Sequence, residues 1–411
     1  MSFDFDAVIV GAGAAGLMAA IRAGERGRRV LLLEKGKKPG VKILMSGGTR
    51  CNITHDCERR GIIEAFGPNG KFLHSALAQL GPRETVQFFE DEGVATKIED
   101  TGKVFPVSDR AVDVLDALLR RLGRSGAKLA LTEPVREIAA NPDGGFRVVT
   151  QARTITAEKV LVTTGGRSFP GCGTTGDGYG FAAAFGHTIR AQRPALVPLT
   201  VQPAWVGELR GITLADPNLK VIDADDKVLA SRRGSMLFAH FGLTGPAPLD
   251  VSRAVSGHPN PATLTLEVDL LPGESEQSFD EFVRVETAAN GKQLLAGVLS
   301  TKLPRRVADQ IVVLCGLQPT RTAAALSKPD RQKIVAATKR LRLPLRGTLG
   351  FEKAEVTAGG VSLDEVDSRT MQSKKQPGLY FAGEVLDLDG WIGGYNFQSA
   401  WSTGWLAGRE L

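Results

Sequence analysis

The sequence predicts an α/β fold in which a Rossmann-type nucleotide-binding domain is interrupted by an insert that is half β and half α. Three observations lead to this prediction. The chain opens with a strand, a glycine turn, a helix and a second strand. After residue 193 the composition changes to short strands broken by Gly and Pro, and then to short helices. After residue 346 the opening style returns, with an apolar strand ending in Gly-Glu and a helix that begins at paired glycines.

Residues 7–33 carry the first observation. Residues 7–10 are a short apolar run, residues 17–24 are small and helix-compatible, and residues 29–33 are a second apolar run. A G-x-G-x-x-G motif follows the first run. The motif alone is weak evidence, but its place after a strand and before a helix is typical of a dinucleotide-binding turn. The alternative is a glycine-rich turn in another kind of βαβ unit.

The glycines and one acid have distinct roles in this interpretation. Gly11 makes the sharp turn, Gly13 lets a pyrophosphate approach the backbone, and Gly16 allows close packing of helix and strand. Glu34 follows the second strand, where a carboxylate can accept hydrogen bonds from a ribose 2′-OH. An acid at this position favours FAD or NAD over NADP.

Length and composition indicate a globular protein of two or three domains. The chain has 411 residues, of which 42% are hydrophobic and 23% charged. The 4 Cys contain no C-x-x-C pair, which excludes a zinc pattern and a disulfide framework and fits a reducing cytoplasm. The 5 His are scattered, so we expect no metal site.

The apolar start is not typical of a secretory signal. Asp4 and Asp6 stand where a signal peptide has Lys or Arg, and the glycine turn interrupts the apolar run. No run of about 18 apolar residues occurs elsewhere, so we expect no membrane span and a cytoplasmic location.

Residues 42–52 bring small residues, a cation, a thiol and an amide into one segment. Such a glycine-rich stretch lets backbone approach a flat ligand, while Arg50 and Asn52 offer hydrogen-bond donors. The alternative is a glycine loop with an ordinary buried Cys. Further strands are expected at 128–131, 134–139, 146–150 and 159–163, and helices at 83–92 and 112–121. The strand at 159–163 ends in Thr164-Gly165-Gly166, as expected where the chain returns to the nucleotide.

The insert is predicted to contain a small antiparallel sheet or barrel and then helices. Short strand candidates lie at 197–201, 219–222, 228–229, 236–238 and 263–268, and helices at 278–287, 292–300, 305–315 and 330–341. Between residues 302 and 346 the chain carries eleven Lys or Arg, opposed there by Asp309 and Asp330 alone.

Residues 378–384 form the last predicted strand, which ends in Gly383-Glu384 and is followed by Asp387. An acid at this position can lie near a polyol, and the glycine-opened helix that follows can face a flavin ring or phosphate. The alternative for both acids is a solvated loop.

Several stretches resemble the YhiN-like flavoproteins, a group that also contains aminoacetone oxidase and a bile-acid-inducible flavin reductase. Beside Glu34 they are GAGAAG at 11–16, SGGTRCN at 46–52, TTGGRSFPGCGTTGDGYG at 163–180, HFGLTGP at 240–246 and FAGEVLDLDGWIGGYNFQSAWSTGWLAG at 381–408.

The resemblance implies a glutathione-reductase-like FAD domain at 1–193 and 347–411, a β-barrel-like domain at 194–274 and a basic helical subdomain at 275–346. It places the pyrophosphate at 11–16, the adenosine ribose at Glu34, the adenine at the Val135 backbone, the ribitol at Asp387 and the flavin ring beside 50–52 and 394–396. The cofactor-binding residues expected are Gly11, Gly13, Ala14, Ala15, Gly16, Glu34, Lys35, Lys42, Ser46, Gly47, Gly48, Arg50, Cys51, Asn52, Val135, Thr164, Gly165, Gly166, Gly383, Glu384, Asp387, Gly394, Tyr395 and Asn396.

One departure concerns Thr49, because the family usually has a third glycine there. A Cβ atom at this position narrows the approach to the flavin.

The function predicted first is an FAD-dependent oxidoreductase that moves a hydride between flavin N5 and a small molecule bound between the FAD domain and the insert. The candidate acid/base groups are Cys51, Tyr395 and His240, and a nearby cation such as Arg50 would lower the Cys51 pKa. A structural role is the alternative for His240 and for Cys51. No second G-x-G-x-x-G follows a strand, so NAD(P)H is expected as a transient donor without a Rossmann domain of its own.

The alternative function is an RNA-modifying flavoenzyme that reduces uracil in ribosomal RNA. The cations of 302–346 would neutralise phosphates, although the segment has no aromatic residue for base stacking. The competing interpretation of that segment is a solvated face. A third reading, an FAD-stabilised structural protein, is disfavoured by the polar, glycine-rich surroundings of the proposed ring.

Overall fold

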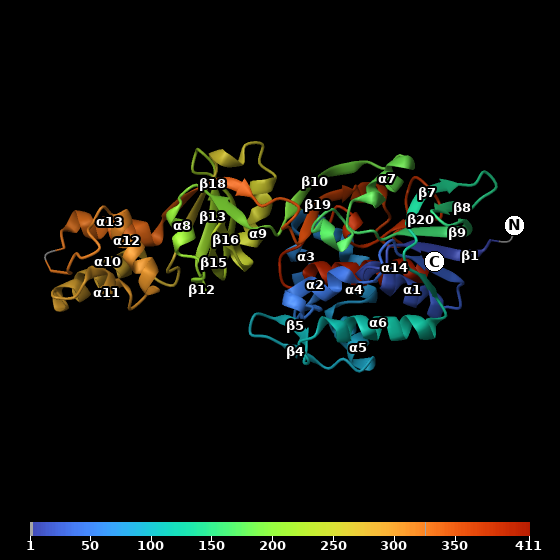
Figure 1. Cartoon of the computed structure of the whole chain (residues 1–411), viewed down its shortest axis with the longest axis horizontal. Helices are drawn as coiled ribbons and strands as arrows, with labels where there is room; N and C mark the ends of the chain where they lie inside the picture. Colours follow the sequence, from blue (N-terminus) through green and yellow to red (C-terminus); the bar gives the residue numbers. More distant parts are fainter. Residues whose placement is uncertain (1–2, 325) are drawn as a thin grey trace. The chain divides into compact units, whose positions relative to one another are not determined.

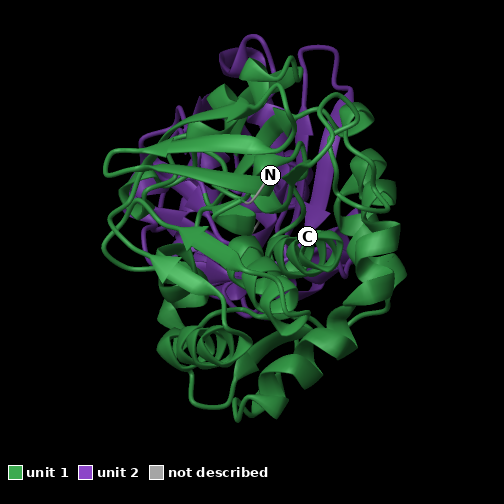
Figure 2. Cartoon of the chain, turned by 90° about the vertical axis from the view of Figure 1, so that its right-hand side faces the viewer, with its two compact units in different colours: residues 1–194, 355–411 green, residues 195–354 purple. Residues whose placement is uncertain are grey.

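The computed structural model describes residues 3–324 and 326–411 (Figure 1). The chain divides into two compact units (Figure 2). Residues 1–194 and 355–411 form what we call the discontinuous unit, and residues 195–354 form the inserted unit. The predicted boundary inside the insert, at residue 274, stays a prediction.

The discontinuous unit begins and ends with the elements that build the nucleotide-binding fold. Its elements in chain order are β1 (Phe5–Val10), α1 (Ala14–Glu25), β2 (Val30–Leu33), α2 (Val41–Thr49), β3 (Thr54–His55), α3 (Arg59–Ala65), η1 (Gly67–Leu73), α4 (His74–Gln79), α5 (Pro82–Asp91), β4 (Thr96–Ile98), β5 (Lys103–Pro106), α6 (Ala111–Ser125), β6 (Lys128–Ala130), β7 (Val135–Ala140), β8 (Phe146–Thr150), β9 (Thr154–Val162), η2 (Pro170–Cys172), α7 (Asp177–Ala184), β10 (Ile189–Ala195), β19 (Val356–Val361), η4 (Leu363–Glu365), β20 (Leu379–Phe381), η5 (Gly383–Val385) and α14 (Tyr395–Glu410).

A seven-stranded sheet forms the centre of this unit, in the order β6-β2-β1-β9-β8-β7, with β20 also paired to β9. β1 runs parallel to β2 and β9, and β20 runs parallel to β9. β7, β8 and β9 form an antiparallel meander, as the predicted hairpin requires. The parallel strands β1 and β2 are buried almost throughout because helices cover parallel sheets on both faces.

Helices α1 and α14 pack closely through small residues. A Cβ atom on Gly404 would lie 2.3 Å from the carbonyl oxygen of Ala15, and one on Gly408 would lie 2.5 Å from that of Ala19. Both glycines therefore let the two backbones approach further than any side chain permits. This contact joins the last helix of the chain to the helix that follows the glycine turn.

The inserted unit combines an antiparallel sheet with a group of helices. Its elements are β11 (Leu199–Val201), α8 (Trp205–Glu208), β12 (Thr213–Leu214), β13 (Asn218–Ile222), β14 (Val228–Arg233), β15 (Met236–Ala239), β16 (Gly242–Thr244), α9 (Pro246–Ser256), η3 (Pro261–Thr263), β17 (Thr265–Asp269), α10 (Glu276–Ala289), α11 (Leu295–Leu299), α12 (Arg305–Leu314), α13 (Lys328–Lys339) and β18 (Leu341–Thr348).

Two details of the insert correct the sequence-based expectations. The eight strands follow the order β12-β15-β16-β11-β18-β17-β13-β14, and the described pairings do not join β12 to β14, so the sheet is not a closed barrel. Residues 341–348, placed mostly in the helical segment, form strand β18, which pairs with β11 and β17. The alternation of buried Leu and exposed Arg or Pro along β18 is the signal that the prediction overlooked.

A buried histidine makes the stability of the discontinuous unit depend on pH. His187 Nε2 lies 2.7 Å from Ser373 Oγ, and its Nδ1 lies 3.3 Å from Glu365 Oε2. Burial, the larger effect, lowers the pKa of His187 below its ordinary value of 6.5 although Glu365 opposes it. The pKa of Glu365 falls to about 2, because hydrogen bonds from Lys375 and Thr188 together outweigh burial.

Both depressed pKa values mean that the folded state binds fewer protons than the unfolded chain. We therefore expect the contribution of His187 to be fully present above pH 6.5 and to be lost as the pH falls below it. Urea unfolding at several pH values tests this, with His187→Gln as the comparison. The loss between pH 7 and 5 should be smaller in the variant, and an equal loss in both proteins would contradict the role of His187.

Candidate active site

The carboxyl ends of four parallel strands meet at one edge of the seven-stranded sheet. Val10 at the end of β1 pairs with Leu33 of β2 and with Val162 of β9, which in turn pairs with Phe381 of β20. The residues that follow these ends are predicted site residues or their neighbours: Gly11, Glu34, Thr163 and Ala382. This edge is where ligands bind in open α/β sheets.

The glycine turn has the geometry that its spacing predicts. Gly11 has a φ of 104° and its amide donates to the carbonyl of Leu33. A Cβ on Gly16 would lie 1.9 Å from the carbonyl oxygen of Gly11, so only glycine lets α1 pack onto the turn. A Cβ on Gly13 would meet nothing within 4 Å, which leaves open space before the first turn of α1. Ala14 and Ala15 begin that turn, whose amide groups have no acceptor inside the helix.

Glu34 and Lys35 lie beside this turn. The Glu34 carboxylate accepts hydrogen bonds from the amides of Ala12 (3.0 Å) and Gly36 (2.7 Å). Lys35 Nζ lies 2.5 Å from Asp177 Oδ2, which ties the start of α7 to the residue after Glu34. The segment leading to Val135, at the start of β7, runs past Glu34, since the amide of Glu133 donates to the Glu34 carbonyl.

Four of the six residues at 46–51 have left-handed backbone, so this segment is a tight coil rather than a simple loop. Helix α2 is broken at Ser46, and Gly47, Gly48 and Thr49 have φ values of 56°, 68° and 70°. Cys51 has a φ of 62°. This sharp coil explains why the segment needs two glycines.

Thr49 is strained, because a β-branched residue in the left-handed region costs about 1–2 kcal/mol. We expect Thr49→Gly, which restores the residue usual in the family, to raise the free energy of unfolding by about 1 kcal/mol once glycine's greater flexibility is deducted. Chemical denaturation measures this change. Thr101→Gly is the control, because Thr101 lies in an exposed turn without a positive φ, and the same glycine should lower stability there. A loss of stability in both variants would contradict the strain at Thr49.

The β4–β5 hairpin holds Arg50. Its Nη1 lies 2.7 Å from Glu99 Oε1 and 3.5 Å from Asp109 Oδ1, and its guanidinium lies 4.0 Å from the centre of the Phe105 ring. The hydrogen bond with Glu99 is the main reason that the pKa of Arg50 is raised. The guanidinium is therefore engaged by two carboxylates of the chain itself.

The expected activation of Cys51 is wrong. Its side chain is fully buried, and burial raises its pKa to about 12, against a small opposing effect of a hydrogen bond with Ser46. Arg50 does not lower this pKa because its charge is directed to Glu99 and Asp109. A thiolate at Cys51 is thus strongly disfavoured at neutral pH.

Asn52 joins the coiled segment to the start of α14. With its amide oriented to suit its neighbours, Oδ1 accepts from the Gly394 amide at 3.0 Å and Nδ2 donates to the carbonyls of Thr54 and Val104. Gly394 has a φ of 93°, and a Cβ there would lie 2.5 Å from the Thr54 carbonyl. Asn396 closes the preceding loop through hydrogen bonds with both backbone groups of Gly390.

Tyr395, the first residue of α14, stacks on His55. Their ring centres are 4.6 Å apart with an angle of 20° between the planes. His55 Nδ1 lies 3.0 Å from the carbonyl oxygen of Gly393, which can only accept, so Nδ1 carries the proton. His55 was not predicted as a site residue, and its place next to SGGTRCN is the only signal that pointed to it.

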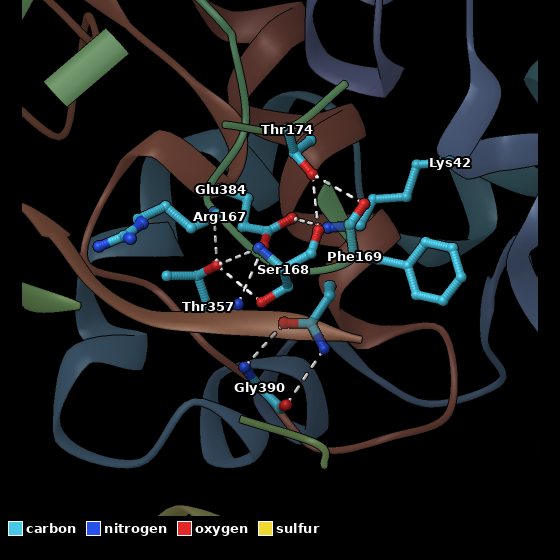
Figure 3. A network of polar contacts seen from close by, with 9 residues as sticks. Lys42, Arg167, Ser168, Phe169, Thr174, Thr357, Glu384 and Gly390 are labelled. Carbon is cyan, nitrogen blue, oxygen red and sulfur yellow. Dashed lines mark hydrogen bonds and ion pairs between the residues drawn. The ribbon is translucent and has the colours of Figure 1, made fainter. Parts of the chain in front are cut away.

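A polar network connects Lys42, Glu384 and the loop after β9 (Figure 3). Lys42 Nζ lies 2.6 Å from Glu384 Oε2, and Glu384 Oε1 accepts from the Thr357 amide at 2.9 Å. The Thr357 hydroxyl accepts from the amides of Arg167 (2.8 Å) and Ser168 (3.0 Å). Sequence reasoning missed Thr357 and Ser168, because single hydroxyl residues inside apolar or glycine-rich runs give no periodic signal.

Other predicted residues lie close to this network. A Cβ on Gly166 would lie 2.9 Å from Glu384 Oε1, and one on Gly383 would lie 2.8 Å from the Cβ of Ala15. Asp387 Oδ1 accepts from the Gly359 amide at 3.1 Å. His240 lies elsewhere, in the inserted unit after β15, and its ring contacts Phe241 edge to face.

The residues at this edge suit a dinucleotide. Gly13 leaves room beside a helix N-terminus, which favours a pyrophosphate, and the buried hydroxyls of Thr164 and Tyr179 have no hydrogen-bond partner within the described chain. Within residues 3–324 and 326–411, no group of three His, Cys, Asp or Glu side chains could hold a metal ion. No described helix is long and apolar enough to cross a bilayer.

Comparison with known families identifies the fold of the whole chain. Residues 5–410 match the family described as HI0933-like protein Rossmann domain. The chain belongs to this family. The resemblance to YhiN-like flavoproteins is thereby confirmed, and the protein is an FAD-dependent oxidoreductase with a Rossmann-type FAD-binding domain.

Three similar proteins illustrate the range of this HI0933-like family and its fold. The chain is 36% identical to the ribosomal RNA dihydrouridine synthase of Escherichia coli K12, covering 99% of this chain and 98% of the relative. It is 31% identical to the 3-dehydro-bile acid delta(4,6)-reductase of Clostridium scindens, covering 98% and 97%. A 3-ketosteroid-delta4-(5alpha)-dehydrogenase structure from Rhodococcus jostii RHA1 shares the fold, with a TM-score of 0.55, 16% identity and coverage of 100% and 97%.

Proposed function

We propose that this protein reduces a carbon–carbon double bond conjugated to a carbonyl group, and that its substrate is a uracil base in ribosomal RNA. The observation that carries this proposal is the 36% identity, over 99% of the chain, to a ribosomal RNA dihydrouridine synthase. A second relative of the same name, from Haemophilus influenzae, is 32% identical over the whole chain. Dihydrouridine differs from uridine by saturation of the C5=C6 bond, which is conjugated to the C4 carbonyl.

The chain's own residues would bind the cofactor, orient the base and supply a proton. When bound, FAD supplies the hydride through N5. Residues 11–16, Glu34 and the Lys42–Glu384 network would hold the nucleotide. Tyr395 would donate its hydroxyl proton to C5 while the hydride adds to C6, so that two C–H bonds replace one π bond. We choose Tyr395 because Cys51 is sealed from solvent with a raised pKa.

The test is incubation of the reduced holoenzyme, without oxygen, with unmodified ribosomal RNA transcribed in vitro. Nucleoside mass spectrometry should find uridine that has gained two hydrogens, and flavin oxidation should accompany it. Free uridine at the same base concentration is the control for RNA recognition. The proposal would be overturned if neither the ribosomal RNA nor fragments of it oxidise the reduced flavin.

The charges of the inserted unit modify the expected role of residues 302–346. Among the residues that the structure describes, at least seven of its eleven cations pair with carboxylates. Most of these carboxylates belong to residues 226–280, which the count along the sequence did not include. The pairs are Lys302–Glu274, Arg305–Asp309, Arg331–Asp280, Lys333–Asp330, Lys339–Asp269, Arg340–Glu276 and Arg342–Glu267. The segment is less positive than its sequence suggests, and we propose RNA contact through Arg306 and Arg346, which bond to backbone carbonyls instead.

A second candidate is reduction of a small conjugated ketone. It is favoured by the bile-acid reductase relative and by the neutralised cations described above. Reoxidation of the reduced protein by a steroid enone, with no response to RNA, would select this candidate.

NAD(P)H is proposed as a transient electron donor for either substrate. No second dinucleotide fingerprint follows a strand in the sequence. Stopped-flow reduction should therefore show rates that rise with NADH or NADPH without saturating in the low micromolar range, and tight saturation would contradict it.

A further inference from the structure

Two buried hydroxyl groups in the discontinuous unit lack any partner in the part of the chain that the structure describes. They are Tyr179 Oη and Thr164 Oγ1. Tyr179 lies in the first turn of α7 and is 7% exposed. Leaving a buried hydroxyl unpaired is unfavourable by about 1–3 kcal/mol, so native proteins almost always provide a partner.

Thr164 borders the glycine turn, and the helix that carries Tyr179 packs against Thr164. A Cβ on Gly11 would lie 3.0 Å from Thr164 Cα, and the hydroxyl of the preceding Thr163 donates to the Gly11 carbonyl at 2.9 Å. A Cβ on Gly178, next to Tyr179, would lie 2.2 Å from Thr164 Oγ1. The start of α7 thus packs directly against the residue that flanks the turn.

A salt bridge fixes α7 in this place. Asp177, its first residue, pairs with Lys35, which follows Glu34. The pKa of Tyr179 is raised, mainly because the side chain is buried. The nearby carboxylates of Glu384 and Asp387 raise this pKa further, and Arg167 opposes them. A tyrosine that stays protonated can act as a hydrogen-bond donor throughout the neutral pH range.

We propose that Tyr179 and Thr164 donate hydrogen bonds to the pyrophosphate oxygens of the bound dinucleotide. Phosphate oxygens only accept, which matches two hydroxyl donors that have no acceptor within the chain. Neither residue belongs to the G-x-G-x-x-G motif. Thr164 is among the cofactor-binding residues that the sequence predicts, without an assigned contact, and Tyr179 is not among them. The inference rests on FAD binding and not on the proposed RNA substrate.

The test compares ligand affinity with apoprotein stability. FAD and ADP are titrated into the flavin-free full-length protein by calorimetry, because ADP contains the pyrophosphate and lacks the flavin. In Tyr179→Phe we expect both dissociation constants to rise by about 10-fold, the usual range for a charge-assisted hydrogen bond. The melting temperature of the apoprotein should not fall, because the variant removes a hydroxyl that is unpaired in that state.

Tyr380→Phe is the matched control, since Tyr380 is also buried in this unit, on β20, away from the glycine turn in the sequence. Thr164→Val carries the same test if Tyr179→Phe yields no folded apoprotein. Unchanged dissociation constants would overturn the proposal, and so would a loss for FAD without a loss for ADP, because the hydroxyl would then face the flavin half. Weakened ADP binding in a protein that never reduces RNA would leave this inference standing while the proposed function fails.

Discussion

Tyr395→Phe is expected to slow substrate reduction by about 10²–10⁴-fold, the usual contribution of a positioned general acid. The variant keeps the ring that stacks on His55 at 4.6 Å, so the start of α14 and the binding of FAD should persist. The step to measure is reoxidation of the reduced protein by RNA or by an enone in a stopped-flow instrument. Reduction by NAD(P)H needs no proton from Tyr395 and should keep its rate.

Two variants make this prediction specific. Tyr380→Phe removes a buried hydroxyl elsewhere in the same unit and should leave the reoxidation rate unchanged. Cys51→Ser should also leave the rate nearly intact, because the thiol is sealed and protonated. If Cys51→Ser slows reoxidation and Tyr395→Phe does not, the proton comes from the thiol and our assignment is wrong.

Gly404→Ala is expected to lower the free energy of unfolding by about 1–3 kcal/mol, the range for overpacking a tight contact. The added methyl group would lie 2.3 Å from the Ala15 carbonyl, so α14 must move away from α1. Since Ala15 belongs to the predicted pyrophosphate site, the flavin content of the purified protein should fall as well. Denaturant unfolding and the visible spectrum measure the two effects.

Gly123→Ala is the control, because the same substitution should raise the free energy of unfolding at that position. Gly123 lies inside α6, and a Cβ there would meet nothing within 4 Å. Alanine should stabilise that helix by about 0.5–1 kcal/mol. If both substitutions stabilise the protein, the close approach of α1 and α14 is not as tight as the structure has it.

Local chemistry made the FAD-binding fold predictable. The strand, turn and helix at 5–25 depend on residues adjacent in sequence, and the family resemblance pointed to the same fold, which is confirmed. The interrupted sheet could also be inferred, because β1, β2, β9 and β20 are each followed within three residues by a glycine or an acid. The predicted barrel failed, since short antiparallel strands alone do not determine whether the end strands pair.

Contacts between distant residues could not be predicted in the same way. The carboxylates that pair with Arg50 belong to Glu99 and Asp109. Because they engage the guanidinium, Arg50 does not lower the pKa of Cys51. The basic segment is partly neutralised by acids that lie far before it in the sequence, such as Glu267 and Asp226, which both pair with Arg342. A charge count along the chain cannot include such pairs. Thr357 is the further example, because its role depends on two amides from residues 167 and 168.

The strand order of the sheet also sets the sequence of events during synthesis. β9 pairs with β20, and α1 packs against α14, but the second member of each pair leaves the ribosome after the inserted unit has emerged. A nascent chain of 354 residues therefore exposes one side of β9 and the face of α1 that its last helix will cover. The inserted unit can fold first, as domains generally do. The cofactor site is therefore completed only after β20 and α14 have emerged, which makes the unfinished first half a natural client for chaperones.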